Sequence, residues 1–350
     1  MKAVACLCRK VNALLHAIFL VDCGADVGLG HVMRCATLAR ELRNLQWTTS
    51  FFGNIPEALA DTCRIFVDGL FQGQCLVPEK LKNFLASGQA DVVCVDHYGF
   101  STEIFAKIRK CMKPTQLLMA LDDVADRVMP VDFVVNPNPG FDGAVYAAQG
   151  IATILSGAPY AVIRPEVVCR RARAWNPFGP LLITLGGGNT SELLMKVLSF
   201  LPKDLVPGII VSLAPQAITE ELQAWMNCDP QRRKLHADIS SFPCILAEAG
   251  YVISGGGTTL WEAYCLGIPS LAIVWVENQR NTVYVGSRFG TGGVIDLTRG
   301  GSLECFPEFF QELIQPQEDR QKKQRILIDG KGAHRIVRAL QAKVHATNRS

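Results

Sequence analysis

The sequence predicts an α/β protein made of two halves, each a parallel β-sheet with helices on both faces. Short, continuously apolar runs, typical of strands buried on both faces, alternate with helix-forming segments along the chain. The same local plan, a strand followed by a glycine loop and then a helix, occurs in both halves. Because such alternation is typical of parallel sheets, we expect two units of this class.

The composition excludes several classes of protein. The chain has 350 residues and is 49% hydrophobic, which suffices for two domains and argues against extensive disorder. A net charge of +3 predicts neither a nucleic-acid partner nor a membrane-surface partner. The 13 cysteines are scattered without a C-x-x-C pair, which indicates a reducing compartment and no zinc site. No apolar run approaches the ~18 residues of a membrane span. We therefore expect a soluble, cytoplasmic monomer.

The chain divides into four predicted regions. Residues 1–16 form an N-terminal extension, whose basic and apolar residues are not followed by the cleavage site of a signal peptide. Residues 17–165 form the first domain and residues 178–330 the second, with the polar stretch from Arg164 to Pro180 as the linker. Residues 331–350 form a C-terminal helix and tail.

The elements of each half follow from apolar runs, caps and loop residues. In the first half we expect strands at 17–21, 48–52, 65–67, 90–95, 116–121 and 132–135, and helices at 31–42, 55–59, 80–86 and 101–110. The loop at 136–140 contains two prolines and a glycine and is predicted as a plain connection. In the second half we expect strands at 181–185, 208–213, 251–254 and 269–276, and helices at 190–201, 220–226, 260–266 and 330–344.

The first glycine loop, with glycines at 24, 28 and 30, ends at a histidine. It follows the strand at 17–21, so backbone N–H groups and a helix N-terminus lie where anionic oxygens bind. The loop lacks the third glycine of the dinucleotide fingerprint and the ending of a P-loop. The helix dipole favours neutral His31, and hence a base, whereas a bound pyrophosphate favours the charged form. From this pattern alone, His31 is either a general base or a packing and capping residue.

Two further glycine clusters, at 186–188 and 255–257, are predicted at strand ends in the second half. Hydroxyl or amide side chains follow each cluster at the start of a helix, so we expect a diphosphate held by backbone N–H groups and helix dipoles. Glu262 lies one turn into the second of these helices and is either a ligand of both ribose hydroxyls or an ion-paired helix residue. Because neither half alone has a full active site, the chemistry belongs in the cleft between them.

Acidic residues follow two predicted strands of the first half. Asp96, Asp122 and Asp123 suggest a metal cluster, but helix capping or binding of loop amides is the favoured interpretation. The sequence has no G-x-S-x-G motif of a serine nucleophile. A pair of catalytic carboxylates, such as Asp22 and Glu277, has no distinguishing context. We expect no bound metal and no cofactor.

A set of motifs, in this order, resembles that of the PseG family, the UDP-2,4-diacetamido-2,4,6-trideoxy-β-L-altropyranose hydrolases of pseudaminic acid (a nonulosonic acid) biosynthesis. The resemblance covers residues 17–297 and implies a GT-B fold, in which two Rossmann-like domains face each other across a cleft. The glycine clusters alone are shared with MurG-like glycosyltransferases. The motifs are Asp22 with Gly28-Leu-Gly-His-Val-Met-Arg34, Val95-Asp-His-Tyr-Gly99, Leu121-Asp-Asp-Val-Ala-Asp-Arg127, Tyr160-Ala-Val-Ile-Arg164, Leu185-Gly-Gly187, Ser254-Gly-Gly-Gly-Thr-Thr-Leu-Trp-Glu262 and Glu277-Asn-Gln279.

The resemblance implies roles for individual residues. His31 corresponds to the general base that activates water, and Tyr98 to a tyrosine that lines the sugar site. Glu262 corresponds to the ribose ligand, and Asn278 to an asparagine near the phosphates and the sugar. The implied reaction is metal-independent cleavage of the anomeric C–O bond with inversion and release of UDP. The expected substrate contacts are Gly28, Gly30, Gly186, Gly187, Ser254, Gly255, Gly256, Thr258, Thr259, Glu262, Asn278 and Gln279.

The chain departs from the family pattern beside the first glycine loop. Leu20 replaces a common arginine, and Cys23-Gly24 replace a common Ala-Ser pair, which leaves the exact sugar open. Three alternatives to the hydrolase also stay open: a MurG-like UDP-sugar glycosyltransferase, a non-catalytic nucleotide-sugar-binding protein and a hydrolysing sugar epimerase.

Overall fold

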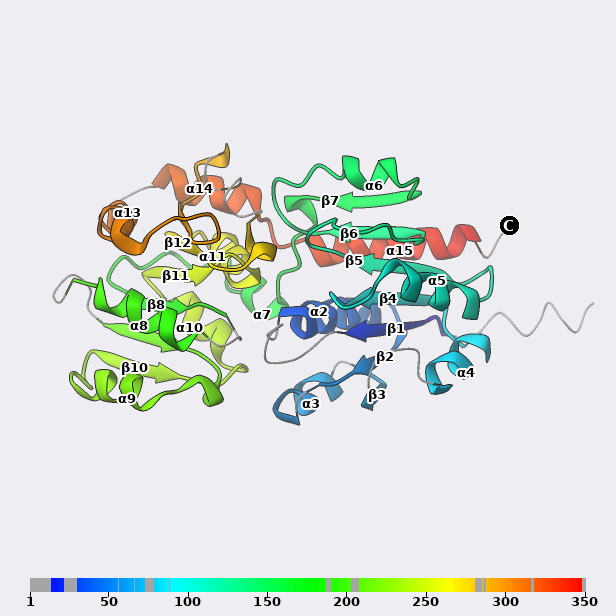
Figure 1. Cartoon of the computed structure of the whole chain (residues 1–350), viewed down its shortest axis with the longest axis horizontal. Coiled ribbons are helices and arrows are strands. Elements are labelled where there is room, and N and C mark those ends of the chain that lie inside the picture. The colour runs from blue at the N-terminus through cyan, green and yellow to red at the C-terminus, as the bar shows by residue number, and fades with distance from the viewer. Residues whose placement is uncertain are drawn as a thin grey trace, which may run out of the picture.

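Two parallel β-sheets, each layered with helices, make up the computed structural model of the chain (Figure 1). The structure describes residues 14–21, 30–55, 57–65, 67–72, 79–87, 89–186, 190–202, 208–280, 285, 288–315 and 318–347. Most of the predicted N-terminal extension and residues 22–29 of the first glycine loop lie outside these ranges. Within them, no helix is long and apolar enough to cross a membrane.

The first sheet has seven strands in the order β3-β2-β1-β4-β5-β6-β7, all parallel. The central strand β1 is buried almost throughout, as its apolar sequence predicts, and its last residue Val21 pairs with Asp96 at the end of β4. This register brings the start of the helix after β1 close to Asp96. The strands are β1 His16–Val21, β2 Thr48–Gly53, β3 Gly69–Gln72, β4 Val92–Asp96, β5 Leu117–Leu121, β6 Phe133–Asn136 and β7 Thr153–Ser156.

Helices cover both faces of the first sheet, and each face has its own apolar core. One core packs α2 against Phe19, Phe51 and the C-terminal helix, and the other packs Ile18 and Val93 against α4, α5 and α6. This confirms the predicted sheet with helices on both faces. The helices are α2 Gly30–Asn44, α3 Glu57–Arg64, α4 Glu79–Ser87, α5 Thr102–Cys111 and α6 Ala144–Ala148.

The second sheet has six parallel strands in the order β10-β9-β8-β11-β12-β13. They are β8 Leu181–Thr184, β9 Ile209–Ser212, β10 Arg233–His236, β11 Tyr251–Gly255, β12 Ser270–Val274 and β13 Gly293–Asp296. The helices are α7 Pro165–Val168, α8 Ser191–Ser199, α9 Glu220–Asn227, α10 Phe242–Glu248, α11 Thr258–Leu266, α13 Phe306–Ile314, α14 Glu318–Leu327 and α15 Gly332–Thr347. Short 3₁₀ turns are η1 Ala158–Tyr160, η2 Pro215–Ala217, η3 Glu277–Gln279 and η4 Leu303–Cys305.

Some predicted elements are wrong or were missed. Ile65 and Val67, the described residues of the strand predicted at 65–67, are not in a strand, because α3 continues to Arg64 and Ile65 is 67% exposed in the turn that follows. The Asp68 carboxylate accepts the Thr49 N–H at 2.8 Å. The chain joins the sheet directly after this contact, as strand β3. The helix predicted at 55–59 is α3, shifted toward the C-terminus. β7, β10 and β13 were missed because these short outer strands are only partly buried and lack an unbroken apolar run.

The C-terminal helix α15 returns from the second half and packs on α2 and η1 of the first (Figure 1). Ile336, Val337 and Leu340 are buried in the same core as Val32 and Ala36 of α2. The end of the chain therefore completes the hydrophobic core of the half in which the chain begins.

We predict that Leu340→Ala lowers the free energy of unfolding by about 2–5 kcal/mol, because it leaves a cavity in this shared core. Leu340 is 1% exposed. The matched control is Arg338→Ala on an exposed position of the same helix, for which we expect a change within about 0.5 kcal/mol. Chemical denaturation measures both values, and equal losses would contradict the packing of α15 on the first half.

Candidate active site

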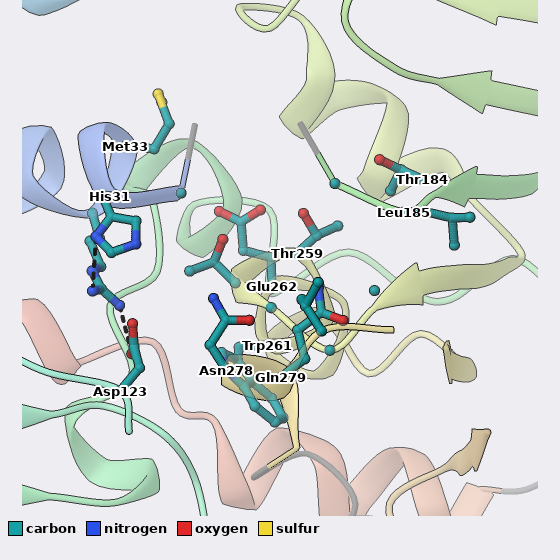
Figure 2. Close-up of a pocket in the computed structure, with 18 of the residues that line it drawn as sticks. His31, Met33, Asp123, Thr184, Leu185, Thr259, Trp261, Glu262, Asn278 and Gln279 are labelled. Carbon is teal, nitrogen blue, oxygen red and sulfur yellow. Dashed lines mark hydrogen bonds and ion pairs between the residues drawn. The ribbon is translucent and has the colours of Figure 1, made fainter. Parts of the chain in front are cut away.

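A cavity of about 870 Å³ lies between the two halves. The first half contributes His31, Arg34 and Tyr98 to its wall, and the second contributes Glu262 and Asn278. Figure 2 shows His31 and Asp123 on one side of the cavity, with Thr184 and Leu185 on the other. The volume is in the range of small-molecule sites. The cavity lies between the two halves, where the sequence analysis predicts the active site.

His31 stands in the first turn of α2, and its ring nitrogen Nδ1 hydrogen-bonds the Asp96 carboxylate at the end of β4. Burial by itself would raise the pKa of Asp96, but Arg34 and His31 outweigh it and hold that pKa well below its usual range. Asp96 is therefore an acceptor, so Nδ1 carries the proton and Nε2 carries the lone pair. Among the described residues, no protein group hydrogen-bonds Nε2, and the ring lines the cavity.

Arg34 lies three residues after His31 on the same face of α2 and binds two carboxylates. Its Nε and Nη2 donate to the two oxygens of Asp96, each at 2.6 Å, and its Nη1 donates to Asp123 at 2.8 Å. Burial by itself would lower the pKa of Arg34, but Asp123 and Asp96 raise it well above its usual value. The guanidinium is thus permanently charged, and it fixes both carboxylates.

This buried cluster has an uneven charge. One guanidinium faces two carboxylates, so the group carries a net negative charge when His31 is neutral. Burial would raise the pKa of Asp123 as well, but Arg34 holds it below its usual value, so both carboxylates are ionised at neutral pH. A net negative charge stabilises an adjacent imidazolium. The arrangement therefore suits a base that takes a proton at Nε2.

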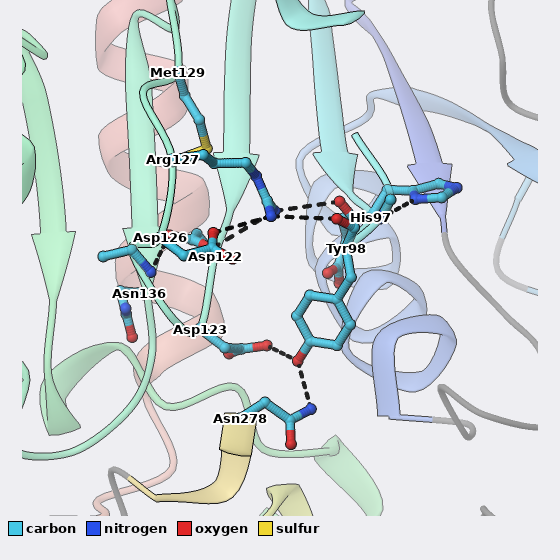
Figure 3. A network of polar contacts seen from close by, with 12 residues as sticks. His97, Tyr98, Asp122, Asp123, Asp126, Arg127, Met129, Asn136 and Asn278 are labelled. Carbon is cyan, nitrogen blue, oxygen red and sulfur yellow. Dashed lines mark hydrogen bonds and ion pairs between the residues drawn. The ribbon is translucent and has the colours of Figure 1, made fainter. Parts of the chain in front are cut away.

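Tyr98 connects this cluster to the second half. Its hydroxyl donates to Asp123 Oδ2 at 2.7 Å and accepts from Asn278 Nδ2 at 3.0 Å (Figure 3). Its ring meets that of His31 edge to face, with centroids 4.5 Å apart. Burial and the Asp123 charge raise the pKa of the hydroxyl, so Tyr98 stays protonated. The hydroxyl thus joins the two halves through one donated and one accepted hydrogen bond, and the predicted catalytic role of Tyr98 in the sugar site stays a prediction.

The three aspartates hold other side chains and a loop. Asp96 and Asp123 bind Arg34, which corrects the expectation that they cap helices or bind loop amides. Asp122 does bind a loop amide, that of Ala125, at 2.9 Å. Arg127 donates to the backbone carbonyls of His97 and Tyr98 and holds that turn in place (Figure 3). In the part of the chain that the structure describes, no group of His, Cys, Asp and Glu is placed to hold a metal ion.

The second half presents glycine loops and a helix N-terminus to the cavity. Gly186 follows β8 with φ +112°, a conformation that favours glycine. Gly255 ends β11, and a Cβ there would lie 2.8 Å from the carbonyl oxygen of Leu185, so only glycine lets the two loops approach. A Cβ on Gly30 would lie 3.9 Å from Thr258 Oγ1, so the first residues of α2 and α11 face each other. Two helix N-termini at one place favour an anionic ligand.

Glu262 is 3% exposed and forms a two-pronged ion pair with Arg164. Nε and Nη2 of Arg164 donate to its two oxygens, each at 2.6 Å. Burial would lower the pKa of Arg164, but Glu262 raises it, so the guanidinium stays charged. The sequence left open an ion-paired residue or a ribose ligand, and the structure shows the ion pair. Glu262 also lines the cavity, and the ribose role stays a prediction.

The other expected contacts fall into three groups. Ser254 does not line the cavity, because it lies inside β11 with no exposed surface, and its hydroxyl donates to the Gly255 carbonyl at 3.0 Å. Gly28 and Gly187 lie outside the described residues. The residues that do line the cavity are Gly30, His31, Tyr98, Gly186, Gly255, Gly256, Thr258, Thr259, Glu262, Asn278 and Gln279.

Sequence reasoning missed the positioning residues. Arg34 and Arg164 each end one of the quoted motifs, but no role was predicted for either, although Arg34 is one turn from His31. Asn138 belongs to the loop at 136–140 that was predicted as a plain connection, yet it lines the cavity. Its side chain contacts Asp123, which belongs to a different loop. Such contacts join residues far apart in the sequence, so local patterns do not reveal them.

Comparisons with known proteins agree on the class of fold. No family profile matches the chain. The spore coat polysaccharide biosynthesis protein SpsG of Bacillus subtilis (strain 168) is 25% identical over 348 residues, covering 93% of this chain and 98% of that protein. The UDP-2,4-diacetamido-2,4,6-trideoxy-beta-L-altropyranose hydrolase of Campylobacter jejuni is 21% identical over 277 residues, covering 77% of this chain and 94% of that protein.

Solved structures show the same architecture. MurG of Acinetobacter baumannii superposes with a TM-score of 0.62 at 15% identity, covering 94% of this chain and 99% of that one. The spinosyn forosaminyltransferase SpnP superposes with a TM-score of 0.64 at 15% identity, covering 95% of this chain and all of that one. The chain therefore has the GT-B fold, which confirms the fold that the motifs imply.

We predict that Asp96→Asn reduces the loss of stability in acid. The folded-state pKa of Asp96 lies below its unfolded value, so its charge stabilises the fold above about pH 4, and this contribution is lost as the pH falls further. The free energy of unfolding of the variant should therefore fall less steeply below about pH 4, by up to about 1.4 kcal/mol per pH unit.

The control for this prediction is Asp61→Asn, which removes the same charge from a side chain that is 87% exposed. Urea unfolding at a series of pH values measures all three proteins. A slope for Asp96→Asn equal to that of the unmodified protein would show that Asp96 does not contribute to the pH dependence of stability.

Proposed function

We propose that this chain is a nucleotide-sugar hydrolase that releases UDP and free 2,4-diacetamido-2,4,6-trideoxy-L-altrose. The observation that carries the proposal is the pairing of His31 with Asp96 at the wall of the cleft, opposite the glycine loops. A buried carboxylate that fixes the tautomer of a histidine, with the other ring nitrogen open to a ligand site, is the arrangement of a general base.

In the proposed reaction, water attacks the anomeric carbon of the sugar. His31 Nε2 takes a proton from this water as the new C–O bond forms, and Asp96 stabilises the resulting imidazolium without becoming protonated. The bond between the anomeric carbon and the diphosphate oxygen breaks, and its electron pair leaves with UDP. Attack from the face opposite UDP inverts the anomeric centre.

The second half stabilises the leaving group in this proposal. The N-terminus of α11 and the backbone at 255–257 provide N–H groups and a positive dipole end for the two phosphates. The Thr258 and Thr259 hydroxyls are available as further donors. Glu262 uses one acceptor position on each oxygen for Arg164, which leaves other lone pairs for ribose hydroxyls.

Two relatives support a role in carbohydrate metabolism. One carries the name of the proposed activity, and the other is named for the biosynthesis of a spore coat polysaccharide. The proposed hydrolysis needs only a bound diphosphate and a water oriented toward the anomeric carbon. The glycine loops and His31, which line the same cavity, support it.

Glycosyl transfer is the second candidate, because the structures that share the fold include glycosyltransferases. In that reaction His31 would take the proton of an acceptor hydroxyl instead of water. A hydrolysing epimerase would release a sugar of different configuration. A non-catalytic binding protein would have no use for the His31–Asp96 pair. The presence of that pair favours a reaction.

The deciding experiment incubates the purified protein with the UDP-linked diacetamido sugar in ¹⁸O-water without an acceptor. Label at C1 of the free sugar, with unlabelled UDP, is the expected result. Label in the phosphate would show P–O cleavage and overturn the mechanism. Bound substrate without any release would favour transfer or binding alone, and a product of another configuration would favour the epimerase.

We predict that His31→Asn lowers kcat by about 10²–10⁴-fold, because it removes the general base. UDP affinity should stay nearly unchanged, since the glycine loops that face the diphosphate belong to the second half. The matched control is His97→Asn, which alters a neighbouring histidine that stacks on Phe100 and does not line the cavity. Steady-state kinetics and calorimetric UDP titration test this, and unchanged turnover in His31→Asn would remove His31 from the mechanism.

A further inference from the structure

We infer that Asn138 is a specificity-determining residue, whose side-chain oxygen accepts a hydrogen bond from the N–H of an acylamino group on the sugar. The inference rests on the proposed function, because it assumes a sugar in the cleft. Asn138 follows β6 in the loop at 136–140 and lines the cavity while being only 8% exposed.

The orientation of the Asn138 amide is fixed by its surroundings. Its nitrogen Nδ2 lies 3.0 Å from Asp123 Oδ1, 3.1 Å from Asn136 Oδ1 and 3.4 Å from the Asp123 carbonyl oxygen. Asp123 is ionised, so it only accepts hydrogen bonds. A flipped amide would place its own oxygen against three acceptors, which is repulsive. The NH₂ group therefore faces these oxygens, and the carbonyl oxygen points away from them.

The neighbouring Asn136 is fixed in the same way. Its Oδ1 accepts the backbone N–H of Asn138 at 3.2 Å, which only an oxygen does. Its Nδ2 donates to the Tyr146 hydroxyl at 3.0 Å, and that hydroxyl donates to Asp122 at 2.6 Å. A buried chain of hydrogen bonds thus holds the Asn138 amide in one orientation, which is the preorganisation that a specificity contact needs.

The Asn138 oxygen is left as an acceptor for a ligand. Among the described residues, no group donates a hydrogen bond to it. This oxygen belongs to a residue that lines the cavity, so a ligand that brings a donor can pair with it in place of water. Val124 and Pro137 line the cavity next to Asp123 and Asn138. An acylamino group fits this surface, because it offers one N–H donor beside an apolar methyl group.

The position of Asn138 places this contact near the reacting bond. Asp123 Oδ1 accepts from both Asn138 and Arg34, and Arg34 in turn holds the carboxylate that orients His31. Three side chains, those of Asp123, Arg34 and Asp96, connect the Asn138 amide to the proposed base. A substituent bound at Asn138 therefore helps to set the orientation of the sugar ring toward His31.

The test measures how Asn138 couples to single groups of the ligand. The full chain carrying His31→Asn, which prevents turnover, is titrated with the UDP-linked diacetamido sugar and with two analogues in which one acylamino group is replaced by hydrogen. The same titrations are made after adding Asn138→Ala. The ratio of affinities cancels any general effect of the variant on Asp123, because that effect is common to all ligands.

We expect one of the two analogues to bind the protein with Asn138 at least about tenfold more weakly than the full sugar, because the acceptor is left unpaired. With Asn138→Ala this difference should shrink to about threefold or less. Equal ratios in both proteins, or no loss with either analogue, would overturn the inference. An analogue with hydroxyl in place of the acylamino group that binds equally well would overturn the assignment to N–H.

Asn227→Ala is the matched control, since it removes the amide of an exposed asparagine that does not line the cavity, and we expect it to retain the tenfold difference. Thermal melts show that each variant is folded. The readout is binding, so it is independent of hydrolysis. Coupling at Asn138 without turnover in the unmodified protein would remove the hydrolase and keep the inference, and turnover without coupling would do the reverse.

Discussion

The buried guanidinium of Arg34 is the interaction on which the rest of the site depends. It binds Asp96 through two hydrogen bonds and Asp123 through a third, at a position that is 6% exposed. Without it, two carboxylates would face each other away from water, and breaking such a buried pair costs about 3–5 kcal/mol. Asp96 orients His31, and Asp123 orients Tyr98 and Asn138. One cation thus positions His31, the Tyr98 contact to the second half and the Asn138 wall of the cavity.

The two halves meet through a small set of specific contacts around the cavity. Tyr98 binds Asn278, Arg164 binds Glu262, and Gly30 faces Thr258. Arg164 stands at the end of the first half, just before α7, and its guanidinium also lies over the Phe242 ring at 5.2 Å. The C-terminal helix α15 adds an apolar contact by completing the core of the first half. Each half therefore forms only part of the cavity wall, and their relative position decides whether His31 and the glycine loops of the second half face the same cavity.

The same geometry serves hydrolysis and transfer, because both reactions need a base on one side of the anomeric carbon and a stabilised diphosphate on the other. What separates the two is the nucleophile that reaches His31. In the proposed reaction the contacts to the sugar lie on the first half, where Tyr98 and Asn138 are held by Asp123. On this proposal, differences between proteins of this fold in substrate and acceptor would arise mainly from the loops after β4, β5 and β6, while backbone groups of the second half would hold the diphosphate.

The sequence by itself determined the fold class, most central strands and the end of the sheet at which ligands bind. Continuous apolar runs such as 17–21 and 251–254 predict strands buried on both faces, because only such strands exclude polar residues from both sides. The glycine clusters and His31 predicted a ligand site in the cleft, because each follows a predicted strand in the sequence. Tertiary structure alone decided the features that depend on distant partners. Arg34 binds both Asp96 and Asp123, and Glu262 pairs with Arg164. Ser254 is buried inside its strand, and α15 returns to the first half. Short outer strands such as β10 also form only because a neighbour offers hydrogen bonds. These features follow from contacts across the sheet and the cleft, which no local pattern of residues records.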